Sequence, residues 1–82
     1  MIQNKHEAEQ LAARYLEGLI VGRKKIDVDV NADRHEGSYW YVSVKPKQLI
    51  SDTLRYYELL SKIETKILRE TGEEILFVPA AS

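Results

Sequence analysis

Apolar residues recur at helical spacing near the start of the chain. They stand at i, i+3, i+4, i+7, i+8, i+11 and i+12, at positions Ala8, Leu11, Ala12, Tyr15, Leu16, Leu19 and Ile20. This spacing places one apolar stripe on a single face of a helix. Asn4 followed three residues later by Glu7 resembles a capping box, and Gly22 is a suitable stop. We therefore predict a helix from about Lys5 to Leu19.

The next two apolar segments have the pattern of strands. Residues 26–30 alternate apolar and polar side chains, and residues 39–44 are aromatic and β-branched until Pro46 ends the ladder. We expect a hairpin between them with a longer loop over residues 32–38. The register that keeps both apolar sets on one face of the sheet pairs Val30 with Trp40, Val28 with Val42 and Ile26 with Val44.

The longest predicted element is a second helix that begins after Ser51 or Asp52 and ends at Gly72. Its expected apolar face consists of Leu49, Tyr56, Leu60, Ile63 and Ile67. Residues 75–78 then form an uninterrupted apolar run before Pro79, which is typical of a strand with two apolar faces. The pattern leaves open which alternate pair, residues 75 and 77 or residues 76 and 78, faces the helices.

The element order α-β-β-α-β predicts an α+β fold in which both helices pack on one face of a three-stranded sheet. The length of 82 residues corresponds to a single domain, 1–82, and 44% hydrophobic with 30% charged residues is a globular composition. The absence of cysteine excludes a disulfide scaffold and a Cys nucleophile, and the net charge of -1 argues against a strongly basic nucleic-acid tail. No apolar run is long enough to span a membrane and no signal-peptide h-region is seen, so we expect a cytoplasmic protein.

A sheet with both helices on one face leaves its other face open. The open face is expected to show Lys25, Asp27, Asp29 and Asn31 from the first strand, and Tyr39, Tyr41, Ser43 and Lys45 from the second. The third strand adds two large apolar side chains, and an exposed apolar patch of this kind favours a cover. We interpret the chain as a small non-enzymatic protein-interaction module that binds a second copy as a homodimer, or another protein. The expected contact residues are Asp29, Tyr39 and Tyr41, together with Leu54 and Tyr57 along the second helix.

An alternative interpretation is an RNA-binding module. The run Arg23-Lys24-Lys25, with Lys45 and Lys47 expected beside it, makes one end of the hairpin positive. Lysines and nearby aromatic rings are groups that bind RNA phosphates and stack on RNA bases. The element order is also similar to the type II KH-like topology of ribosome-associated proteins. The chain lacks the Gly-x-x-Gly turn of that family, so the resemblance concerns the fold and no site residue is carried over.

A third interpretation is a metal-dependent enzyme. The pattern Asp27-Val28-Asp29 resembles, over five residues, the metal-binding strand of nucleotidyltransferase-fold proteins, which implies Mg²⁺ or Mn²⁺ held by the two carboxylates. The Gly-Ser that precedes that motif is missing, because Gly22 is followed by Arg23. His6 and His35 are expected to be solvated, and no nucleophile elbow or phosphate-binding glycine loop is present. We therefore expect no catalytic residue, no cofactor and no bound metal.

Overall fold

The computed structural model of the chain describes residues 2–80, and in that range it contains two helices and five strands. Helix α1 spans Lys5–Leu16 and helix α2 spans Thr53–Thr71. A short hairpin is formed by β1 (Ile20–Val21) and β2 (Lys24–Lys25), and the main sheet has the order β3-β4-β5, with bounds Val28–Glu36, Tyr39–Pro46 and Glu74–Pro79. The predicted α+β fold with a three-stranded sheet is confirmed. The β1–β2 hairpin was not predicted.

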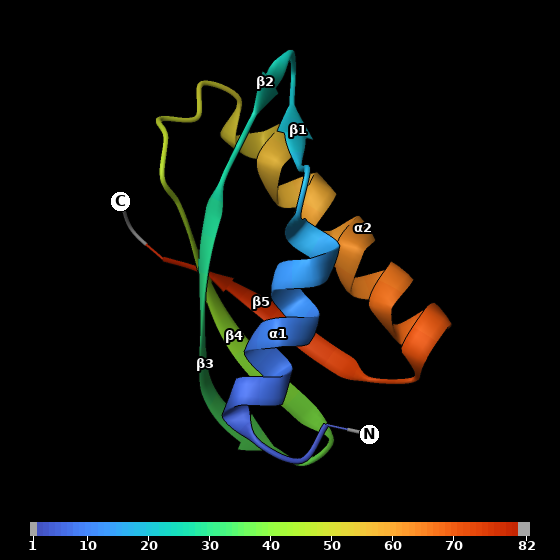
Figure 1. The fold of residues 1–82 in the computed structure, drawn as a ribbon. Coiled ribbons are helices and arrows are strands. Elements are labelled where there is room, and N and C mark those ends of the chain that lie inside the picture. The colour runs from blue at the N-terminus through green and yellow to red at the C-terminus, as the bar shows by residue number, and fades with distance from the viewer. Residues whose placement is uncertain (1, 81–82) are drawn as a thin grey trace.

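Both helices lie against the same face of the main sheet, and no helix or strand of residues 2–80 covers the opposite face (Figure 1). β4 runs antiparallel to β3 and parallel to β5, and α2 makes the connection between the two parallel strands. The core lies between this face and the helices because alternate side chains of each strand point inward. The buried strand residues are Ala32, Trp40, Val42, Val44, Ile75 and Phe77, and the buried helix residues are Ala8, Ala12, Leu16, Tyr56, Leu60 and Ile67.

Helix α1 ends three residues earlier than the prediction, at Leu16 instead of Leu19. Gly18 adopts a left-handed φ of 78°, which glycine tolerates and which stops the helix, and Leu19 then folds back into the core. Asn4 is the N-cap, as predicted, and its side chain accepts a hydrogen bond from the Glu7 N–H. The Glu7 carboxylate binds the Gln3 N–H at 2.7 Å, so the reciprocal bond is displaced by one residue from that of a capping box.

The predicted hairpin register and the predicted loop over residues 32–38 are wrong. Glu36 pairs with Tyr39, so the turn is only Gly37 and Ser38, and Gly37 has the positive φ of 60° that the first position of a type II′ turn requires. Val30 consequently lies opposite Val44 instead of Trp40. The displacement is an even number of residues, so the side chains predicted to face inward on β4 still do so. A bulge between Ala32 and Arg34 shifts the alternation along β3 by one residue, so His35 lies opposite Trp40.

The ends of α2 agree with the prediction. The Asp52 carboxylate accepts a hydrogen bond from the Arg55 N–H at 3.0 Å, and Gly72 ends the helix with a left-handed φ of 77°. Leu49 was wrongly placed on the buried face of this helix, because it precedes the helix and is 87% exposed. Within the described residues, neither helix is both long enough and apolar enough to cross a membrane.

Candidate interaction surface

The open face of the main sheet divides into a polar half on β3 and an apolar half on β5. β5 buries Ile75 and Phe77, so Leu76 and Val78 are the pair that points to the open face, with exposed fractions of 37% and 39%. β4 lies between the two halves, and its register places Tyr41 beside Leu76 and Ser43 beside Val78. This resolves the choice that the sequence left open for the last strand.

The polar half is internally paired. The Arg34 guanidinium lies 4.2 Å from the centre of the Tyr41 ring and forms an ion pair with Glu36 at 2.8 Å. Ser43 donates a hydrogen bond to the Asp33 carboxylate. These contacts occupy the charged groups of β3 and cover part of the Tyr41 ring, so Tyr41 is less exposed than Tyr39.

The apolar half continues around the β5 edge onto α2. Tyr57 and Leu76 line one depression of about 290 Å³ between this helix and the strand. The adjoining depression, of about 240 Å³, is lined by Leu68, Leu76 and Tyr39. The sheet face and the flank of α2, which the sequence presented as separate contact surfaces, therefore meet along β5. We call this continuous area the β5 surface, which consists of Tyr39, Tyr57, Leu68, Leu76 and Val78.

Glu64 lies at the centre of this surface and lines both depressions. Its carboxylate accepts a hydrogen bond from the Phe77 N–H at 2.7 Å. Burial raises the pKa of the Glu64 carboxyl above its usual range, and the hydrogen bond from Phe77 opposes that increase. Glu64 thus holds α2 against β5 with a backbone contact.

Both edges of the main sheet are blocked against a further strand by the same device. Glu9 of α1 accepts a hydrogen bond from the Ala32 N–H of β3 at 2.9 Å, as Glu64 does from Phe77 of β5. Pro79 contributes no N–H to the β5 edge, and the β3 edge is interrupted by its bulge. Carboxylates, prolines and bulges at sheet edges disfavour edge-to-edge pairing. These features make the two edges poor templates for a further strand.

The structure places three of the five predicted contact residues, Asp29, Tyr39 and Tyr41, on the strands of the open face. Asp29 lies opposite Lys45 and forms an ion pair with Lys47 at 3.5 Å, so it belongs to the polar half. It does not lie beside Tyr41, which pairs with Arg34. Leu54 and Tyr57 are exposed on α2, as predicted, with Leu54 at 69%.

Three residues of the β5 surface, Leu68 of α2 and Leu76 and Val78 of β5, were not among the contact residues expected from the sequence. Because both faces of that strand are apolar, no sequence pattern distinguishes its outward side. The shift in the hairpin register did have a signal, since a Gly-Ser pair between strand-forming residues is typical of a two-residue turn.

The two carboxylates of the metal hypothesis have other partners. Asp27 precedes β3 and accepts a hydrogen bond from the Gln48 side-chain amide at 3.3 Å, while Asp29 pairs with Lys47. Across residues 2–80, no three potential metal-ligating side chains come together. His35, expected in a loop, instead belongs to β3, and its ring stacks on Trp40 at 4.2 Å between centroids.

The basic run Arg23-Lys24-Lys25 lies in the short hairpin and not in the main hairpin, where it was predicted. Lys24 and Lys25 form β2 of the short hairpin and do not belong to the main sheet. Lys25 and Lys47 nevertheless line the same depression, of about 630 Å³, together with Arg14. Glu17 and Asp27 line it as well, so the depression carries both signs of charge.

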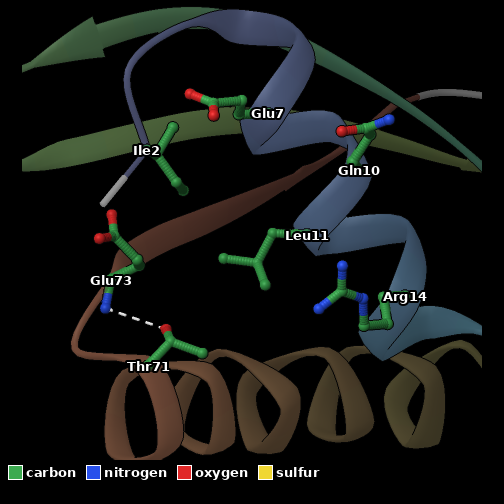
Figure 2. Close-up of a pocket in the computed structure, with 7 residues that line it drawn as sticks. All are labelled: Ile2, Glu7, Gln10, Leu11, Arg14, Thr71 and Glu73. Carbon is green, nitrogen blue, oxygen red and sulfur yellow. Dashed lines mark hydrogen bonds between the residues drawn. The ribbon is translucent and has the colours of Figure 1, made fainter.

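A further cleft of about 320 Å³ lies between α1 and the junction of α2 with β5. Figure 2 shows Leu11 of α1 pointing into this space, with the Thr71 hydroxyl bound to the Glu73 N–H on the opposite side. The hydroxyl of Tyr15 donates a hydrogen bond to Glu70 at 2.8 Å, which links the two helices. These contacts hold α1 and α2 together, and none of the residues that line the cleft belongs to the β5 surface.

Comparison of the chain with known protein families, curated proteins and solved structures finds no match in any of the three.

Proposed function

We propose that the chain is a non-enzymatic protein-interaction module that associates with a second copy of itself through the open face of its sheet. The observation that carries this proposal is the position of Leu76 and Val78. Both are large apolar side chains on a face that no element of the described chain covers, and they lie beside Tyr41 and Ser43 of β4. Complete burial from full exposure is worth about 1.5 to 3 kcal/mol for such a side chain, so covering the remaining 37% of Leu76 and 39% of Val78 is worth about 0.5 to 1 kcal/mol each. A twofold dimer repeats this gain in both copies.

Charge on the open face supports self-association. Asp29, Asp33 and Glu36 contribute negative charge and Arg34 and Lys45 positive charge, so the polar half carries both signs, which a twofold arrangement can set opposite one another. A specific interface buries about 800 Å² per partner, which is about 15% of the 5521 Å² accessible surface of the described chain. A cytoplasmic location is part of this proposal.

The test is the mass of the protein in solution, measured by light scattering and sedimentation up to ~0.5 mM, far above the micromolar range of a specific interface. The parent should have twice the chain mass of 9.5 kDa. Leu76→Lys should remain folded by circular dichroism, because lysine is well tolerated on edge strands, and should have the mass of a monomer.

Ile20→Lys is the matched control. Ile20 is 57% exposed on β1, away from the main sheet, so this variant should retain the dimer mass. Leu76 is preferred to Tyr41 for the test because Arg34 already covers the Tyr41 ring. A parent that is monomeric at ~0.5 mM, or a dimer that survives both Leu76→Lys and Val78→Lys, contradicts the proposal.

RNA binding is the second candidate, supported by the depression that Arg14, Lys25 and Lys47 share. Binding there should weaken steeply with salt, because phosphate contacts release counterions. The measurement is fluorescence anisotropy with a labelled mixed-sequence RNA at several salt concentrations. Lys25→Gln should reduce both the affinity and the salt slope, whereas Lys62→Gln on α2 should change neither. Equal effects of the two substitutions, or no binding at low salt, would exclude this candidate.

A further inference from the structure

A cavity of about 340 Å³ lies at the ends of β4 and β5, next to the beginning of α2. Its apolar lining residues are Pro46, Leu49, Ile50, Pro79 and Ala80. The polar side chains that line it are Gln48, Thr53, Tyr56 and Tyr57, and no charged side chain does so. The volume lies in the range of small-molecule sites, and the cavity lies beyond the carboxyl ends of the two parallel strands, β4 and β5.

Tyr56 distinguishes this cavity from the other depressions of the surface. The side chain is 3% exposed, and its hydroxyl is the one buried side-chain polar atom of residues 2–80 that has no hydrogen-bond partner. Burial also raises the pKa of the Tyr56 hydroxyl, which keeps it protonated as a donor. Long side chains on a helix lean toward its N-terminus, so Tyr56 leans toward the end of α2 that borders the cavity.

Leu49 at the cavity is 87% exposed, so an occupant of the cavity can cover part of this apolar side chain. A buried donor without an acceptor lowers the stability of the free protein. A molecule in the cavity that carries an acceptor would satisfy Tyr56 and bury part of Leu49. Both features are explained by the same occupant.

We propose that this cavity binds a small uncharged molecule that is mostly apolar and accepts one hydrogen bond from the Tyr56 hydroxyl. The apolar lining selects the body of the molecule, and the absence of charged lining residues selects a neutral one. A carbonyl oxygen or an unprotonated ring nitrogen provides the acceptor. The proposal goes beyond self-association and does not depend on it.

The experiment compares two probes of similar size, acetophenone, which has a carbonyl acceptor, and ethylbenzene, which has none. Each is titrated into ¹⁵N-labelled protein while amide shifts are followed by NMR. Both should cause saturable shifts at residues 48–57 and 80. Tyr56→Phe should lower the affinity for acetophenone about 3- to 10-fold, which is the effect of one net hydrogen bond. The affinity for ethylbenzene should fall less than about 2-fold. Tyr39→Phe is the control and should change neither affinity, because Tyr39 is exposed on β4 and does not line this cavity.

Thermal unfolding of the free protein provides an independent measurement. Tyr56→Phe removes an unpaired hydroxyl, so its Tm should equal or exceed that of the parent. A fall in Tm of more than about 4 °C would show that the hydroxyl has a partner in the free protein, which overturns the proposal. The proposal is also overturned if neither probe causes saturable shifts, or if Tyr56→Phe lowers the affinities for the two probes equally. The same titration of Leu76→Lys should give unchanged affinities, which separates this result from the outcome for the dimer.

Discussion

Replacing Trp40 should remove most of the stability of this protein. Trp40 is the one tryptophan in the chain, it is only 7% exposed, and it lies in the middle strand of the sheet. A buried aromatic side chain covers about 150 to 250 Å², which at about 25 cal/mol per Å² corresponds to about 4 to 6 kcal/mol. Alanine retains little of that contact, so Trp40→Ala should cost about 3 to 5 kcal/mol. A chain of this length has a total stability of about 4 to 12 kcal/mol.

The assay is urea unfolding followed by circular dichroism, since Trp40→Ala removes the fluorescent side chain. With a slope near 1 kcal/mol per M, the midpoint should fall by about 3 to 5 M, or no folded baseline should remain. His35→Ala provides a graded comparison, because it removes only the ring stacked on Trp40 and should cost about 0.5 to 1.5 kcal/mol. A Trp40→Ala midpoint within about 0.5 M of the parent would refute the assignment of this ring to the core.

Three further substitutions test local features. Glu64→Gln should raise stability at neutral pH by less than about 1 kcal/mol, since water screens this half-exposed group. The raised pKa of Glu64 means that the ionised carboxylate is unfavourable in the folded state, so this gain should vanish as the pH falls below the ordinary carboxyl pKa. A gain that persists in acid unfolding curves at about pH 3 contradicts this reasoning. Asp52→Ala should cost about 1 kcal/mol in urea unfolding by removing the bond to the Arg55 N–H, whereas Asp52→Asn should cost much less. Gly72→Ala should lower the free energy of unfolding by about 1 kcal/mol, because Gly72 has a left-handed φ of 77° that alanine adopts only with strain. The measurement is the Tm, and an unchanged Tm would show that the helix end rearranges freely.

The sequence alone determined the elements whose signals are local. Asn4, Asp52 and Gly72 mark helix ends by their own side chains or backbone freedom, and the apolar spacing of α2 identifies Tyr56 as a core residue. The alternation of β4 likewise predicts that Trp40 faces the core. These features depend on residues that are near one another along the chain, so periodicity and capping chemistry are sufficient to find them.

Tertiary structure decided the features that depend on distant partners. The apolar run at residues 75–78 buries Ile75 and Phe77 because α2 packs on that side, and nothing within the run itself distinguishes its two faces. The register of the hairpin followed from a two-residue turn and a bulge, since either change alone alters which residues meet across the strands. The unpaired Tyr56 hydroxyl and the union of the α2 flank with the open sheet face arise in the same way. Both depend on which side chains β4, β5 and α2 bring together after the chain has folded.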